Sequence, residues 1–132
     1  AGDLAQARAW TARAAAGGHV RAMHDLGVYY ARGDGGALDP AAAFRWFRQA
    51  AAFGVADSAF NLGILYEQGR GVSADPSEAT FWFLVAMRAG DANAGAHAET
   101  LEVQLTPMQR EQAQARADAF RAQTPDVSVN AP

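Results

Sequence analysis

The sequence predicts an all-α fold, an α/α superhelical solenoid of helix pairs that ends in a C-terminal capping helix. Trp10, Trp46 and Trp82 are 36 residues apart, and a glycine follows each of them eight residues later. A repeat period between about 20 and 50 residues is typical of solenoids and other repeat arrays. The chain also has 33 alanines and a single isoleucine among its 132 residues, which favours closely packed helices over a sheet.

Further residues repeat with the same period in the first two units. The dipeptide Leu26-Gly27 recurs as Leu62-Gly63, and Asp39-Pro40 recurs as Asp75-Pro76. A glycine within a helix has no intrinsic advantage there, so a repeated one indicates a packing requirement. We therefore expect Gly27 and Gly63 to lie at helix–helix contacts where no side chain fits.

Each unit is predicted to contain two helices. Apolar residues at helical spacing place the first helix of a pair at residues 20–32 and 56–68, and a glycine ends each of them. An aspartate N-cap followed by proline begins the second helices at residues 40–53 and 76–89. A matching second helix at residues 3–16 opens the chain.

The C-terminal part departs from the repeat. Residues 91–104 form a degenerate third first helix, and Thr106 to Gln109 have the cap, proline and glutamine of a helix start. This start predicts a polar capping helix at residues 106–123. Its few apolar residues should lie as a narrow stripe on the third unit: Met108, Ala113, Ala117 and Phe120.

These elements define one repeat domain of about three helix pairs. The domain covers residues 1–123, including the capping helix. Residues 124–132 contain two prolines and no helical periodicity, so we expect them to form a flexible tail.

Composition excludes several classes of function. The net charge of −3 offers no long-range attraction for nucleic acid. The absence of Cys and Lys excludes disulfides, thiolate chemistry and lysine-based catalysis. The longest apolar run, Phe81–Met87, is far shorter than the roughly 20 residues of a membrane-spanning helix. We therefore expect a soluble segment without membrane insertion, with any targeting signals outside it.

No pattern of residues indicates an enzyme, a metal site or a cofactor. His19, His24 and His97 lack the spacing of metal ligands. The segment Gly71-Val72-Ser73 lacks the second glycine and the preceding strand of a nucleophile elbow. We therefore expect a non-catalytic protein.

Six aromatic residues on the predicted second helices have two interpretations. A platform for stacking nucleic-acid bases would need basic residues around it, and the sequence has no basic surplus there. The alternative, a core between the repeats, is our prediction for Phe44, Trp46, Phe47, Phe81, Trp82 and Phe83.

The second unit resembles the Sel1-like repeat, an α/α relative of the tetratricopeptide repeat. The resemblance rests on residues 59–72 (AFNLGILYEQGRGV), on Asp75-Pro76 and on residues 79–83, and it extends over about residues 3–105. The third unit departs from the pattern, with Ala98-Glu99 in place of Leu-Gly. The resemblance implies a right-handed stack whose first helices line a concave face. It also implies a non-catalytic scaffold for protein–protein interactions.

The order of elements in the C-terminal part of the chain resembles a second group of proteins. The final unit, Leu105 to Gln109 and a helix rich in Ala, Arg and Gln are similar to the C-terminal capping of PodJ-type polar localisation factors of alphaproteobacteria. This resemblance implies a periplasmic domain of a membrane-anchored cell-polarity factor. Three alternatives stay open: a cytoplasmic signalling adaptor, an envelope module that binds peptidoglycan fragments or another envelope ligand, and a purely structural spacer.

The outward positions of the first helices supply the predicted partner-binding residues. Aligned by the period, these columns change chemistry from unit to unit, whereas the core columns repeat. The predicted concave face consists of Arg21, His24, Arg32, Asp57, Phe60, Asn61, Glu67, Gln68 and Asn93.

Charge and size within this set predict the kind of partner. Arg21 is expected beside Asp57 and Arg32 beside Glu67, and such a mixed surface suits an extended peptide or a helix of alternating charge. Phe60 is the one large apolar side chain of the set. We expect it to anchor the partner and to contribute little to the fold.

Overall fold

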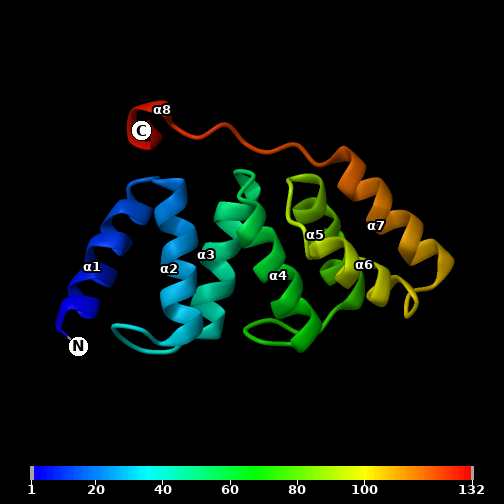
Figure 1. Ribbon diagram of the computed structural model, residues 1–132, viewed down its shortest axis with the longest axis horizontal. Coiled ribbons are helices and arrows are strands. Elements are labelled where there is room, and N and C mark those ends of the chain that lie inside the picture. Colours follow the sequence, from blue (N-terminus) through cyan, green and yellow to red (C-terminus); the bar gives the residue numbers. More distant parts are fainter. Residues whose placement is uncertain (1, 132) are drawn as a thin grey trace.

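Helices make up the regular structure of residues 2–131, the part of the chain that the computed structural model describes, and no strand occurs there. The helices are α1 (Gly2–Ala16), α2 (Val20–Arg32), α3 (Pro40–Ala52), α4 (Ala56–Gln68), α5 (Pro76–Arg88), α6 (Ala94–Glu102), α7 (Pro107–Ala119) and α8 (Val127–Asn130). Helices α1 to α7 follow one another along the long axis, and the chain then returns along one edge to α8 (Figure 1). The predicted solenoid of helix pairs is confirmed.

Local capping explains where the helices of the first two units begin and end. Asp39 and Asp75 each cap a second helix with a side-chain oxygen that accepts N–H groups of the first turn at 3.0–3.1 Å. Gly33 and Gly69 end α2 and α4 with φ values of 75° and 67°, in the left-handed region that favours glycine. The predicted bounds of these two first helices are confirmed.

Helix α6 is shorter than the predicted third first helix. Asp91 Oδ1 accepts hydrogen bonds from the N–H groups of Asn93 and Ala94 at 2.9 and 3.1 Å. These bonds hold the residues before Ala94 in a turn, so the helix begins there and ends at Glu102.

Helix α7 begins as predicted but ends early. Thr106 and Gln109 exchange the two hydrogen bonds of a capping box. The helix ends at Ala119 rather than at Gln123, because Phe120 takes up an extended backbone and its ring lies against Phe81 and Trp82 of α5. The region predicted as a tail without regular structure contains one helical turn, α8.

The predicted apolar stripe of α7 is partly correct. Ala113 and Ala117 are buried and Phe120 packs against the core, whereas Met108 is exposed. The cap therefore packs on α5, through its middle and its C-terminal end.

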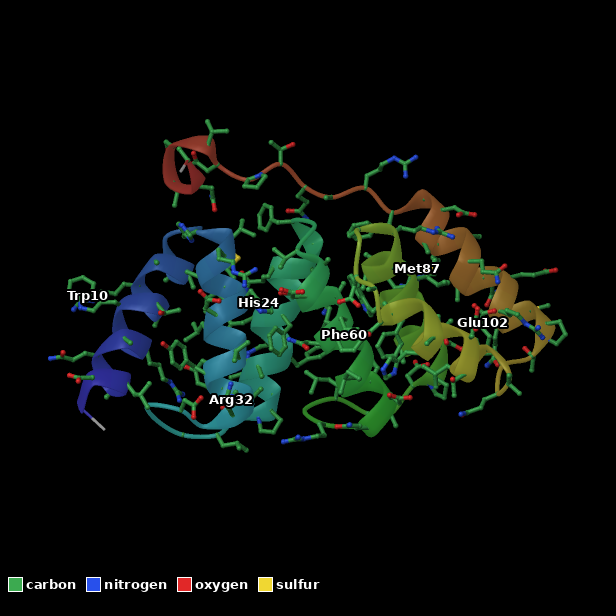
Figure 2. All side chains as sticks on the ribbon, in the orientation of Figure 1. Trp10, His24, Arg32, Phe60, Met87 and Glu102 are labelled. Carbon is green, nitrogen blue, oxygen red and sulfur yellow. The ribbon has the colours of Figure 1, made fainter. Side chains whose placement is uncertain are left out.

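The core lies between successive helices and centres on the phenylalanines that follow the second and third tryptophans. Phe47 and Phe83 are 2% and 0% exposed. Trp46 and Trp82 are half-buried, and Trp10 is 67% exposed and projects away from the end of the solenoid (Figure 2). Of the six aromatics predicted to form the core, Phe47, Phe81 and Phe83 are buried, and Phe44, Trp46 and Trp82 pack at its margin.

Gly27 and Gly63 lie against these buried rings, as predicted. A Cβ at Gly27 would lie 2.6 Å from the ring of Phe47, and a Cβ at Gly63 would lie 2.6 Å from the ring of Phe83. Side chains essentially never come so close, so only glycine fits at either position. The repeated sequence period therefore encodes a repeated contact between helix backbone and aromatic ring.

Candidate functional site

Helices α2, α4 and α6 lie side by side and form one surface, which we call the first-helix face. Arg21 on α2 is 3.7 Å from Asp57 on α4, and Glu67 on α4 is 3.9 Å from His97 on α6. The predicted proximity of Arg21 and Asp57 is confirmed. Arg21 also contacts Asp25 at 3.6 Å. This end of the face therefore has two acidic side chains, Asp25 and Asp57, around one basic side chain.

The predicted proximity of Arg32 and Glu67 is wrong. Arg32 lies at the end of α2 (Figure 2) and pairs with Asp34 at 3.1 Å. Glu67 projects from the side of α4 that faces α6, where it contacts His97. The two side chains therefore lie on opposite sides of α4.

His24 is turned into the seam between α2 and α4 (Figure 2). It is 6% exposed, and its Nδ1 shares a hydrogen bond of 2.7 Å with Ser58 Oγ. Its ring lies 5.6 Å from that of Phe47. The prediction that His24 is a surface contact is therefore wrong, because the imidazole fills space that the small Ser58 leaves.

The surroundings of His24 disfavour its charged form. Burial lowers the pKa of His24 below its ordinary value of 6.5, and Arg21 lowers it further. Asp25 and Asp57 act in the opposite direction, and the pKa stays lowered. The folded protein therefore holds His24 neutral at a pH where the unfolded chain is already protonated.

We expect the free energy of unfolding to fall as the pH is lowered from about 7.5 to about 5.5. The unfolded chain binds a proton at His24 near pH 6.5, whereas the folded chain does not, so protons favour unfolding. Urea denaturation at several pH values measures this dependence. His24→Gln removes the titrating group, so its stability should vary less with pH. If the free energy of unfolding varied with pH equally in the variant and the wild type, the lowered pKa of His24 would not be the cause of the pH dependence.

Phe60 lies at the edge of the core, near the middle of the first-helix face (Figure 2). Its ring centroid is 5.5 Å from that of Phe83 and 5.2 Å from that of His97. The expectation that Phe60 contributes little to the fold is therefore wrong. Its contact with a partner stays a prediction.

A groove of about 290 Å³ lies between the C-terminal halves of α2 and α4. Toward the N-terminal ends, His24 and Ser58 fill the seam between the same two helices. The groove is lined by Val28, Ala31, Arg32, Phe47, Asn61, Ile64, Leu65, Gln68 and Arg70. Its floor is apolar and its rim is polar, the usual composition of a binding site.

The groove brings together three of the predicted site residues, Arg32, Asn61 and Gln68. Arg21 and Asp57 lie outside it, at the N-terminal ends of α2 and α4, and Phe60 and Glu67 face α6. Asn93 is exposed in the turn before α6, beyond the groove.

Sequence reasoning missed the apolar floor. Val28 and Ile64 are 36 residues apart and follow directly after the repeated Leu-Gly pair, so they form one column of the repeat. Both are half-buried, which lets them pack against the core and still face the groove. The repetition of an apolar residue, Val28 and Ile64, directly after the Leu-Gly pair was the sequence signal that could have indicated this floor.

The charged residues that line the groove are both arginines. Arg32 pairs with Asp34, and Arg70 has no ion-pair partner among residues 2–131. No carboxylate belongs to the lining. The groove therefore suits a segment that combines apolar side chains with a carboxylate near Arg70.

Residues 2–131 contain neither a metal-binding cluster nor a membrane-spanning helix. No group of three or more acidic or histidine side chains there is arranged to hold a metal ion. No helix in that part of the chain has the length and apolar character needed to cross a membrane.

Comparisons with known proteins agree on the repeat. The profile of the Sel1 repeat matches residues 2–19, 20–53 and 56–91. The crystal structure of a protective antigen present in uropathogenic Escherichia coli strains, which displays an SLR fold, is similar with a TM-score of 0.83 and 29% identity over 88% of this chain. A Sel1 repeat protein from Oxalobacter formigenes is similar with a TM-score of 0.74 and 27% identity over 86% of this chain.

The chain spans 25% of the length of the first of these proteins and 49% of the second. The comparison with curated proteins gives no match. Sel1 repeat proteins generally act as protein-interaction scaffolds, and the fold is typically non-catalytic. The matches to three successive units, together with the helix pairs and their repeated glycine contacts, show that this chain belongs to the Sel1 repeat family.

Proposed function

We propose that this chain is a non-catalytic protein-interaction scaffold and that the groove between α2 and α4 receives a segment of its partner. The observation that carries this proposal is the combination of an apolar floor, Val28, Ile64 and Leu65, with a polar rim on the face that the first helices form. A peptide that places an apolar side chain on such a floor removes water from it, and the rim orients the peptide.

The partner segment is expected to carry a carboxylate next to an apolar residue. Arg70 stands at the C-terminal end of the groove without an ion-pair partner among the described residues. A bidentate carboxylate contact would use its planar guanidinium. The opposite end of the first-helix face carries Asp25 and Asp57 against Arg21, so the charge pattern also sets the direction of the bound segment.

The cellular setting is part of the proposal. The order of the last unit, the Leu105 to Gln109 segment and a polar capping helix supports a PodJ-type polar localisation factor, with this domain in the periplasm as part of a membrane-anchored protein. Localisation of the full-length protein by fractionation of envelope and cytoplasm tests this setting. Recovery in the cytoplasm alone would favour a signalling adaptor.

A photo-crosslinking amino acid in place of Gln68 tests whether the partner binds in the groove. Gln68 lies on the rim of the groove, whereas Arg45 on α3 lies outside it and provides the matched position. In cells that carry the full-length protein, the crosslinker at position 68 is expected to capture a protein that the same crosslinker at position 45 does not. Co-sedimentation with purified sacculi in the absence of a captured protein would instead favour a peptidoglycan-binding module.

Arg70→Glu is expected to weaken binding of the captured partner about tenfold, because the groove then repels the carboxylate. Arg45→Glu makes the same change of charge on α3 and is expected to leave the affinity within about twofold. Isothermal titration calorimetry with the partner segment measures both. Loss of binding in Arg45→Glu, with Arg70→Glu unaffected, would place the partner on the second helices.

A further inference from the structure

The segment after α7 runs along one edge of the solenoid (Figure 1). Hydrogen bonds attach it at two turns. The Gln123 N–H donates a hydrogen bond of 2.8 Å to the carbonyl of Ala52, the last residue of α3. In α8, Asn130 Oδ1 accepts a hydrogen bond from the Val20 N–H at 2.6 Å, and Asn130 Nδ2 donates one to the Gly18 carbonyl at 3.1 Å.

The two attachment points are equivalent turns of the repeat. Gly18 and Gly54 are 36 residues apart, and both have positive φ values, 96° and 92°. A Cβ at Gly54 would lie 2.9 Å from the Cβ of Ala122, so glycine lets the returning segment lie close to the turn. The repeat that builds the solenoid thus also provides the edge along which the segment runs.

Asn130 completes the N-terminus of α2. The first N–H groups of a helix have no acceptor within it. His19 Nδ1 accepts the N–H of Ala22 at 3.1 Å, and Asn130 accepts that of Val20. Asn130 Nδ2 also donates to the Asp126 carbonyl at 2.9 Å, which holds the amide group in one orientation.

We propose that residues 121–131 are a clasp that fixes α1 and α2 relative to α7 and thereby controls the groove. Helix α2 is one wall of the groove, and the turn attached at Ala52 leads into α4, the other wall. With the clasp released, α2 keeps its packing on α3 and its Arg21–Asp57 and His24–Ser58 contacts with α4, but it loses its attachment to the C-terminal segment. We expect the α2 wall to become more mobile, so a partner binds more weakly. The effect on the partner rests on the proposed function, whereas the effect on α2 does not.

Hydrogen exchange at two amides, followed by NMR, measures the clasp directly. The N–H groups of Val20 and Gln123 both donate hydrogen bonds in the clasp contacts, so we expect both to exchange slowly in the wild type. Asn130→Ala is expected to speed exchange at both amides at least tenfold, because loss of one attachment frees the other. Gln123→Pro removes the other donor and is expected to have the same effect at Val20. Val127→Ala changes an exposed residue of α8 and is the matched control, with wild-type exchange at both amides.

A pair of spin labels measures whether release of the clasp lets α1 move relative to α7. The chain has no Cys, so labels at Arg13→Cys in α1 and Glu111→Cys in α7 are specific. The distribution of distances between them is expected to broaden in Asn130→Ala. Wild-type exchange at Val20 and Gln123 together with an unchanged distribution in that variant would overturn the clasp.

Crosslinking from Gln68 separates the two proposals. In Asn130→Ala, capture of the partner is expected to fall at least threefold relative to the wild type. Equal capture despite faster exchange at Val20 would overturn the control of the groove by the clasp. An absence of capture in the wild type, with faster exchange at Val20 in Asn130→Ala, would contradict the proposed function and support the clasp.

Discussion

Replacement of Gly63 with leucine is expected to lower the free energy of unfolding by about 3 kcal/mol, the upper end of the usual cost of overpacking a core. Even the first carbon of the new side chain would lie 2.6 Å from the ring of Phe83. That ring is 0% exposed, and His97 and Phe60 pack on it at centroid distances of 4.8 and 5.5 Å. It therefore has no space into which to move. Urea denaturation followed by circular dichroism measures the change.

Gly95 in α6 provides a matched control for this contact. A Cβ there would meet the flexible side chain of Met87, with the sulfur at 3.2 Å, rather than a buried ring. Gly95→Ala is expected to leave the stability unchanged or to raise it by less than about 1 kcal/mol, because alanine favours a helix over glycine. Gly63→Ala is expected to cost about 1–3 kcal/mol. Equal effects of the two alanine substitutions would contradict the role of Gly63.

The repeat could be predicted from the sequence because its signals are local. A glycine that ends a helix and an aspartate that caps the next act within a few residues, so the ends of α2 and α4 and the starts of α3 and α5 follow from the sequence. The C-terminal end of α7 depends instead on tertiary contacts. Phe120 fits the apolar pattern of a helix, yet it leaves α7 because its ring packs beside Phe81 and Trp82, at 6.4 and 6.0 Å.

The binding face was predicted less well, because alignment of repeats does not say how far each helix is turned about its axis. His24 and Phe60 share one column of the repeat, and each packs against the phenylalanine of the next second helix, Phe47 and Phe83. Since that phenylalanine column is buried, the column of His24 and Phe60 also faces inward. The clasp had no sequence signal at all, because Asn130 and Val20 are 110 residues apart.

Removal of the capping helix is expected to destabilise the solenoid and to make it associate with itself. Helix α7 buries Ala113 and Ala117, and Arg116 lies over the ring of Phe81 at 4.0 Å. Burial of these residues and of Phe120 contributes about 3 kcal/mol. The ion pairs of α7 with α5, Arg116–Glu78 and Arg88–Asp118, are partly exposed and add little.

Truncation after Leu105 exposes the α5 surface that α7 covers, including Phe81, and also removes the clasp. Its melting temperature is expected to fall by roughly 10 °C, and light scattering should show oligomers, because the last apolar face of a solenoid binds other chains when it is left open. Truncation after Phe120 keeps the cap and removes the clasp, so this control should stay monomeric and melt close to the wild type. If truncation after Leu105 also gave a stable monomer, α7 would be a linker rather than a cap. If the two truncated proteins had equally lowered melting temperatures, the clasp rather than α7 would stabilise the end of the solenoid.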